Sequence, residues 1–185
     1  MGFYGDTVVV GGEFTQTSAG AYGKVARFHP NGATDTSFAN PAVGGDYRSI
    51  RKLAVDGAGR VTIVGAFTSI GGDSTYAKVA RIASDGSVDT TFTPPVLSGG
   101  NADVIAVTWQ SDGRAVIGGR FTSVGGQSRG YIARLEANGT PESDFNPNAD
   151  NQVWALDLDS SGRILVGGFF TTIGGISRAN LARID

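Results

Sequence analysis

Apolar residues along this chain gather in short runs that glycine-rich polar turns separate. Residues 153–185 show the unit: an apolar run at 153–158, the turn DSSG at 159–162, the run ILVGGFF at 164–170, and the run NLARI at 180–184. Runs of this length, bounded by Asp, Ser and Gly, are typical of β-strands joined by tight turns. No stretch has apolar residues at helical spacing. We therefore expect an all-β chain with strands over more than half of its residues and no helix longer than one turn.

The pattern repeats with a period near 50 residues. The string FTSIGG at 67–72 returns as FTSVGG at 121–126 and as FTTIGG at 170–175, and a degraded copy, FTQTSAG, occupies 14–20. The repeated phenylalanines are Phe14, Phe67, Phe121 and Phe170, and the repeated arginines are Arg27, Arg81, Arg134 and Arg183. A fixed period of this length is the signature of one supersecondary unit that is copied and stacked. An aromatic ring kept at one register fills one repeated hole, so we expect Phe67, Phe121 and Phe170 to be buried between units.

Short antiparallel strands at this period predict a β-propeller-like array of about four blades. The strands are apolar on both faces because each small sheet packs against the next. The pairs Gly118-Gly119 and Gly167-Gly168 lie inside strands, where either the close approach of another backbone or a bulge in the strand explains them. A parallel β-solenoid competes with this prediction, but its coils are shorter, about 20 to 30 residues. We divide the single repeat domain 1–185 into approximate units 1–48, 49–102, 103–152 and 153–185.

The number of leading strands differs from the number of repeats. Four copies of the central hairpin are present, but the apolar run before it is evident only at 49–57, 104–113 and 153–162. Three alternatives remain open: a fragment of a larger propeller, a protomer that completes a ring or filament by association, or a closed four-blade ring in which MGFYG supplies the missing strand. Repeat arrays need capped ends. We therefore expect self-association or docking onto further repeats or assembly subunits.

Composition and charge exclude several classes of function. The net charge of −2 provides no basic surface for nucleic acid. No apolar run approaches the ~18 residues of a membrane span, and the opening MGFYGDTVVV lacks the layout of a secretory signal. The chain has no cysteine and a single histidine, His29, which removes thiolate metal sites and most acid–base chemistry. We expect no cofactor and no bound metal.

Most motifs are best explained by structure. The repeated arginines are expected to pair with repeat-matched acids such as Asp35 or Asp89 and so to tie one turn to the next. The string DLDSSG at 157–162 resembles the first half of a calcium loop, but Gly168 stands where the bidentate glutamate belongs, so we interpret it as a turn. The serines of GGDS, GGQS and GGIS lack the strand-to-helix context of a nucleophile.

Two tryptophans depart from the repeat. Trp109 aligns with Val55 and Leu158 and is interpreted as a core residue. Trp154 aligns with Arg51 and Ile105, at a position that tolerates a charge and is therefore partly exposed. An exposed tryptophan stacks on a sugar ring or anchors a protein partner. Trp154 and Arg51 are therefore the candidate contacts for a ligand or partner.

The phrase GRILVGGFFTTIGGISRANLARI at 162–184, with the Asp-Gly turns and the Asp-x-x-Phe-x-Pro tail, resembles the delta-60 repeat, a β-propeller repeat of unknown function. The resemblance spans 7–185, and the first copy departs most, with TSAGAYG in its turn. It implies a bacterial surface, secreted or phage virion protein, and it brings no catalytic residues. We expect a non-enzymatic structural or adhesive module that contacts proteins or carbohydrates.

The alternative is a propeller enzyme or small-ligand sensor with an acidic axial pocket. Four aspartates lie in or near loops that differ between the repeats, and such an enzyme or sensor requires them to converge. They are Asp6, Asp46, Asp103 and Asp150.

Overall fold

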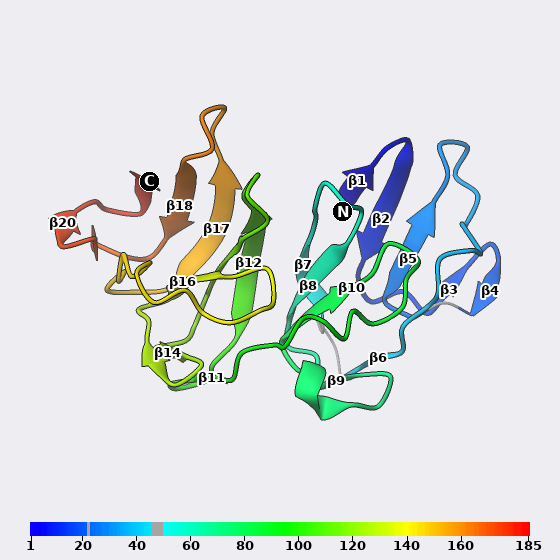
Figure 1. Ribbon diagram of the computed structural model, residues 1–185, viewed down its shortest axis with the longest axis horizontal. Coiled ribbons are helices and arrows are strands. Elements are labelled where there is room, and N and C mark those ends of the chain that lie inside the picture. Colours follow the sequence, from blue (N-terminus) through cyan, green and yellow to red (C-terminus); the bar gives the residue numbers. More distant parts are fainter. Residues whose placement is uncertain (22, 46–49) are drawn as a thin grey trace. The chain divides into compact units, whose positions relative to one another are not determined.

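The computed structural model describes residues 1–21, 23–45 and 50–185, and strands dominate this part of the chain (Figure 1). Its one helical element is a single 3-10 turn, η1 (Ser74–Tyr76). The all-β prediction is confirmed. The expectation that strands cover more than half of the residues is wrong, because the strands are two to six residues long and the segments between them are held by side-chain hydrogen bonds in turns.

Four three-stranded antiparallel sheets hold the four repeats, one sheet to a repeat. The strand orders, with bounds, are β1 (Gly2–Tyr4), β2 (Thr7–Gly11) and β5 (Val25–Phe28) in the first sheet; β10 (Val79–Ile82), β8 (Val61–Gly65) and β7 (Ile50–Val55) in the second; β12 (Val104–Trp109), β13 (Ala115–Gly119) and β16 (Ile132–Leu135) in the third; and β17 (Val153–Leu158), β18 (Ile164–Gly168) and β21 (Leu181–Ile184) in the fourth.

Smaller strands form where each repeat carries its glycine-rich string. They pair as β3 (Gln16–Thr17) with β4 (Gly20–Ala21), β6 (Val43–Gly44) with β9 (Ser69–Ile70), β11 (Leu97–Ser98) with β14 (Ser123–Val124) and then β15 (Gln127–Ser128), and β19 (Thr172–Ile173) with β20 (Ile176–Ser177). In the last hairpin both residues of the turn, Gly174 and Gly175, have positive φ, which a two-residue type I′ turn requires.

The first sheet has a leading strand that the count of apolar runs missed. Residues 2–4 form β1, and Tyr4 pairs with Thr7 across a two-residue turn. Gly5 has φ of 55° in this turn, and the Thr7 hydroxyl donates to the Tyr4 carbonyl. The segment MGFYG therefore supplies a leading strand to the first repeat. It escaped the count because it is only three residues long and its large side chains, Phe3 and Tyr4, are exposed.

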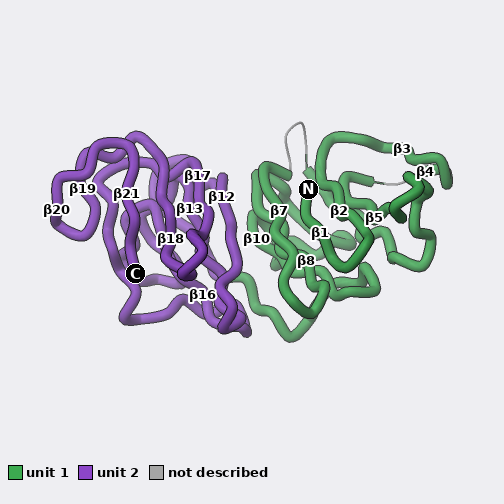
Figure 2. Tube along the Cα trace, turned by 90° about the horizontal axis from the view of Figure 1, so that it is seen from above, with its two compact units in different colours: residues 1–94 green, residues 95–185 purple. Residues whose placement is uncertain are grey.

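The chain forms two compact units, Met1–Pro94 and Pro95–Asp185, and each contains two of the four sheets that hold the repeats (Figure 2). In the second unit, β17 lies between β18 and β12 (Figure 1). The core there joins Ala106, Val116 and Ile132 of the third sheet to Val153 and Leu156 of β17. One face of the third sheet is thus buried by the fourth. The four-part division at 48, 102 and 152 stays a prediction.

The repeated phenylalanines lie at the base of each small hairpin. Phe67, Phe121 and Phe170 are fully buried, and Phe14 of the degraded first copy is half-buried. The carbonyl of each accepts a hydrogen bond from the residue before the third strand, as in the 3.0 Å bond from the Tyr131 amide to Phe121. These donors are Lys24, Lys78, Tyr131 and Asn180, and all four have φ between 60° and 67°. A left-handed residue at the same place in every copy is a feature of the fold rather than of one site.

Three of the repeated arginines, Arg27, Arg81 and Arg134, each contact an acid and an aromatic ring. In the first repeat the Nε atom of Arg27 donates to the Asp35 carboxylate at 2.7 Å, and its guanidinium carbon lies 4.8 Å from the centre of the Phe38 ring. The acid stands eight residues and the phenylalanine eleven residues after the arginine. We call this arrangement the Arg–acid–Phe clasp. It recurs, with the same spacing, in Arg81, Asp89 and Phe92 and in Arg134, Glu142 and Phe145.

The clasp ties the third strand of a repeat to the segment that leads onward along the chain. In the second repeat Arg81 is 1 % exposed, and its Nε atom lies 2.6 Å from the Asp89 carboxylate. Charge-assisted bonds in such a desolvated place are strong, and removal of one partner is costly. The pairs Arg27–Asp35 and Arg81–Asp89 that the spacing suggested are both present.

The clasp carboxylates have lowered pKa values. Hydrogen bonds from Ser37 and from Arg27 lower the pKa of Asp35 to about 2, against the burial that raises it. A hydrogen bond from Arg134 likewise lowers the pKa of Glu142 below its usual range.

Stability is therefore expected to fall in acid. The folded-state pKa of Asp35 lies below the value near 4 of an unfolded aspartate. Its contribution is fully present above a pH of about 4 and is lost as the pH falls through about 2. Urea unfolding at a series of pH values measures this, and Asp35→Asn should flatten part of the curve between about pH 4 and 2. An unchanged pH dependence in Asp35→Asn would contradict the attribution of this loss of stability to Asp35.

Candidate functional site

Each complete leading strand carries a β-bulge at the same point. The register shifts between Ile50 and Lys52 in β7, between Val104 and Ala106 in β12, and between Val153 and Ala155 in β17. The residues inside the three bulges are Arg51, Ile105 and Trp154. A bulge redirects a side chain away from the regular pleat. The position shared by Arg51, Ile105 and Trp154 is therefore displayed by the same β-bulge in three repeats.

A glycine faces the start of each bulge, since Gly65 pairs with Ile50, Gly119 with Val104 and Gly168 with Val153. A Cβ on Gly168 would meet the carbonyl oxygen of Gln152, and a Cβ on Gly119 would meet that of Asp103. The backbone of the leading strand thus approaches too closely for any side chain. This is the close approach that the paired glycines suggested, and it lies within the sheet itself.

Trp154 is held in a fixed orientation although 42 % of it is exposed. Its indole Nε1 donates to the Gln152 side-chain oxygen at 3.2 Å, and the same oxygen accepts from the Nε atom of Arg120 at 3.0 Å. The Arg120 guanidinium carbon lies 5.2 Å from the centre of the Trp154 ring. On the other side Phe169, which is 61 % exposed, lies with its ring centroid 5.5 Å away and tilted by 57°.

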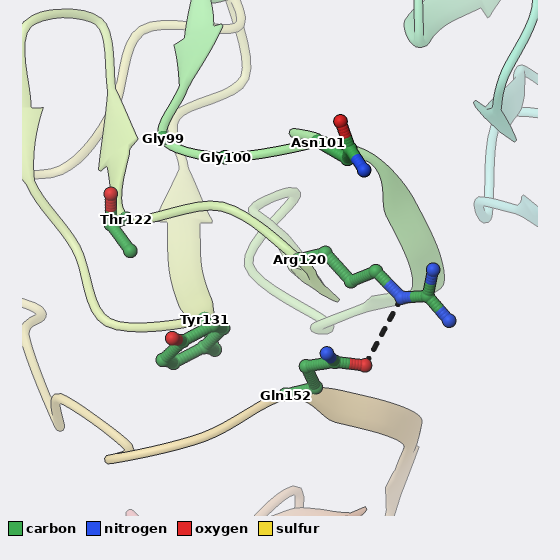
Figure 3. Close-up of a pocket in the computed structure, with 7 residues that line it drawn as sticks. All are labelled: Gly99, Gly100, Asn101, Arg120, Thr122, Tyr131 and Gln152. Atoms are coloured by element: carbon green, nitrogen blue, oxygen red, sulfur yellow. Dashed lines mark hydrogen bonds between the residues drawn. The ribbon is translucent and has the colours of Figure 1, made fainter.

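A pocket of about 330 Å³ lies beside Arg120 and Gln152, the two residues that hold the Trp154 ring, and both line it. Figure 3 shows the Arg120 guanidinium bonded to Gln152, with the side chains of Asn101, Thr122 and Tyr131 around the pocket. Backbone of Gly99 and Gly100 completes the lining. All of these residues belong to the second unit, and none of the lining side chains is a carboxylate. Trp154, Phe169 and this pocket together are called the Trp154 site.

None of the described candidate acids lines this pocket. Asp6 lies exposed in the turn between β1 and β2, Asp103 is buried before β12, and Asp46 lies outside the described residues. Asp150 accepts hydrogen bonds from the Thr171 hydroxyl and from the amides of Thr171 and Thr172. These bonds, that of the Thr171 hydroxyl first, lower its pKa to about 2.

Side chains that could bind a metal do not cluster among the described residues. Among the residues that the structure describes, no group of three His, Cys, Asp or Glu side chains is arranged to hold a metal ion. Asp159, in the string that resembles a calcium loop, instead accepts from the Ser161 amide at 2.8 Å and from the Nε atom of Arg163 at 2.8 Å. The carboxylate therefore closes its own turn.

Two further residues that the sequence singled out are Arg51 and Trp109. Arg51 is exposed in β7 of the first unit, and Trp109 is half-buried at the end of β12. Sequence reasoning missed Arg120 and Phe169. Both stand directly before a repeated phenylalanine, where the other copies have Ala66 and Glu13. Variation of residue type beside a repeated ring was the available signal.

A family model described as "Domain of unknown function (DUF5122) beta-propeller" matches residues 6–38, 59–92, 110–145 and 160–185. The four matched segments fall on the four repeats. The chain belongs to this β-propeller family. Its three-stranded sheets are thus the blades of a propeller fold, as the period predicted, whereas the delta-60 repeat remains a resemblance. No curated protein matches the sequence.

Solved structures agree on the fold. The chain is similar to the WD40 β-propeller domain of Doa1 (TM-score 0.56, 18 % identity, 97 % of this chain and 46 % of that one). It is also similar to a protein of unknown function from Bacteroides caccae, with a TM-score of 0.53 and 12 % identity over 97 % of this chain and 58 % of that one. A third similar structure is the extracellular domain of the putative one component system BT4673 from B. thetaiotaomicron. Its TM-score is 0.57 and its identity 17 %, over 100 % of this chain and 22 % of that one. The chain thus spans less than two thirds of each of these structures.

Proposed function

We propose that this chain is a non-enzymatic binding module of an extracellular protein, on a bacterial surface or a virion, and that its Trp154 site binds carbohydrate. The observation that carries the proposal is a partly exposed tryptophan ring whose hydrogen-bond partner, Gln152, also lines a pocket of amide, hydroxyl and guanidinium groups without a carboxylate. Sugar rings offer an apolar C–H face to an aromatic ring and hydroxyls to such donors and acceptors. A pocket of about 330 Å³ with a few polar groups is in the usual range for small ligands.

The acidic alternative has less support. General acid–base catalysis needs a carboxyl group within hydrogen-bond reach of the reacting atoms. Asp150, the candidate acid nearest in sequence to Trp154, already accepts three hydrogen bonds from the 171–172 segment. Its lowered pKa keeps it ionised at neutral pH, which disfavours a role as general acid.

The extracellular part of the proposal draws on two comparisons. One similar structure is an extracellular domain, at 17 % identity, and the resemblance to the delta-60 repeat points to surface, secreted or virion proteins. The described residues also form no helix that could cross a bilayer.

Protein contact is a second candidate function, and a different surface favours it. On the fourth sheet the outward face exposes Leu181 (70 %) beside the half-buried Leu165, and Ile176 is exposed in the hairpin nearby. Apolar side chains gathered on one sheet face mark an interaction surface. This surface supports docking onto further repeats or another subunit of an assembly.

A glycan array with the purified 185-residue chain tests the carbohydrate proposal. The wild type should bind a defined set of glycans, and Trp154→Ala should weaken that binding at least tenfold, because the ring supplies most of the apolar contact. Ile176→Ala removes an exposed apolar side chain of the same unit outside the Trp154 site and should bind like the wild type. Absence of glycan binding, or equal binding by Trp154→Ala, would contradict the proposal. Chemical conversion of a bound glycan would contradict its non-enzymatic part.

A further inference from the structure

The guanidinium of Arg120 carries a charge that no acid in the described part of the chain balances. Its Nε atom donates to the side-chain oxygen of Gln152 at 3.0 Å, and its central carbon lies 5.2 Å from the centre of the Trp154 ring. Among the described residues no carboxylate lies at ion-pair distance from it, and its two terminal nitrogens form no hydrogen bond. Figure 3 shows these nitrogens at the far end of the side chain, pointing away from Thr122 and Tyr131. One side of the guanidinium is thus fixed to Gln152, and its terminal nitrogens are available to a ligand.

The repeat does not require a charge at this position. Arg120 stands directly before a repeated phenylalanine, where the other copies have Glu13, Ala66 and Phe169. In the second repeat the short side chain of Ala66 is exposed, and the neighbouring Phe67 is still fully buried. The blade therefore folds without an arginine here, and the charge of Arg120 serves the Trp154 site rather than the repeat.

A hydroxyl and an amide of the same pocket are also available to a ligand. In the fourth repeat the Thr171 hydroxyl donates to the carboxylate of Asp150. The matching residues of the third repeat are Thr122 and Asn101, and both line the pocket. Neither of these two side chains forms a hydrogen bond with another described residue. A neutral amide thus stands where the next repeat has a carboxylate that occupies its threonine.

A carboxylate is the ligand group that suits this arrangement. The two terminal nitrogens of a guanidinium form paired hydrogen bonds to the two oxygens of one carboxylate. No lining side chain of the pocket is a carboxylate that would repel it. Among sugars, the uronic acids carry a carboxylate directly on the pyranose ring, beside the C–H face that lies against an aromatic side chain.

We propose that the Trp154 site binds an acidic glycan, with the carboxylate of a uronic acid residue held by the two terminal nitrogens of Arg120. The ring of that residue lies against the exposed parts of Trp154 and Phe169. The next sugar residue of the glycan lies in the pocket, where Asn101 and Thr122 offer it an amide and a hydroxyl. The inference rests on the proposed carbohydrate binding and names the class of ligand.

Isothermal titration with paired oligosaccharides tests the inference. Trimers of galacturonate, glucuronate and mannuronate are each titrated as the free acid and as the methyl ester, which keeps the sugar rings and removes the charge. We expect at least one free acid to bind the 185-residue protein at least about tenfold more tightly than its methyl ester, because a charge-assisted pair is lost in the ester. Arg120→Gln should bind acid and ester alike. A variant that only disturbed the Trp154 ring would weaken both forms equally, so the ratio of the two affinities isolates the charge.

Two further variants control for charge and shape. Arg178→Gln removes an equal charge from an exposed position of the same unit outside the Trp154 site, and it should keep the preference for the acid. Arg120→Lys keeps the charge without the planar fork and should recover only part of the preference. Circular dichroism of each variant shows whether it folds, and Ala66 at the matching position indicates that replacement of Arg120 is tolerated.

Four outcomes would overturn the inference: no free acid bound at millimolar concentration, equal binding of acid and ester, a preference that survives in Arg120→Gln, or a sulfated galactose trimer without carboxylates bound as tightly as the best acid. Neutral glycans that bind through Trp154 without any preference for acids would overturn this inference and leave the carbohydrate proposal in place. Acids that bind through Arg120 equally well in Trp154→Ala would instead contradict the role of the tryptophan ring. A failure of this inference and a failure of the carbohydrate proposal are therefore separable.

Discussion

Replacing Phe121 by alanine is expected to lower the free energy of unfolding by about 3–5 kcal/mol. The ring is fully buried, and the backbone carbonyl of Phe121 accepts a hydrogen bond from the left-handed residue Tyr131 just before the third strand. Truncation would leave a cavity at the base of the hairpin, which a close-packed interior fills only in part. Urea unfolding followed by circular dichroism measures the loss.

Phe169 and Phe170 provide the matched comparison for this prediction. They are neighbours in the sequence, but Phe170 is fully buried and Phe169 is 61 % exposed. Phe170→Ala should resemble Phe121→Ala, whereas Phe169→Ala should cost about 1 kcal/mol or less. A loss below about 1 kcal/mol for Phe121→Ala would show that the repeated ring does not fill the hole that the repeat predicts.

Replacing Asp89 by alanine is the second change with a large expected effect. It removes the ion pair of Arg81, whose side chain is 2 % exposed, and leaves a guanidinium charge in a desolvated place. Breaking a buried pair on one side costs about 3–5 kcal/mol, more than the pair itself contributes. Denaturant unfolding of the variant measures the loss.

Asp112 supplies the control for Asp89. Its carboxylate also pairs with an arginine, Arg114, but the two side chains are 44 % and 30 % exposed. Exposed pairs contribute about 1 kcal/mol or less, so Asp112→Ala should be much milder than Asp89→Ala. Equal losses in the two variants would mean that the clasp is no more than a surface ion pair.

The repeat unit could be predicted from the sequence because the same residue types recur at the same spacing. Arg81 and Asp89 stand eight residues apart, as do Arg27 and Asp35, and the structure joins both pairs. The alignment of Trp154 with Arg51 and Ile105 was also visible, since it needs only the turn as a reference. The period and the turns therefore predicted the blades.

Features that depend on how neighbouring strands are aligned could not be predicted from the sequence. The paired glycines allowed a bulge, but its position at Trp154 depends on the backbone of Gln152 lying against Gly168, and a sequence does not state which residue faces a glycine. The leading strand of the first sheet was only one of three alternatives, because Gly2–Tyr4 lacks an apolar run. The contribution of Arg120 depends on the packing of the third sheet against the fourth, which brings its guanidinium over the Trp154 ring.

The most direct test of the account is the affinity of the Trp154 site for its ligand. Isothermal titration of the strongest glycan from the array should give a saturable binding isotherm with the wild type, and Trp154→Ala should bind at least tenfold more weakly while it unfolds at the same urea concentration. The partly exposed ring contributes little to the hydrophobic core, so its removal should leave the blade folded. Wild-type affinity in Trp154→Ala would contradict the assignment of this surface as the binding site.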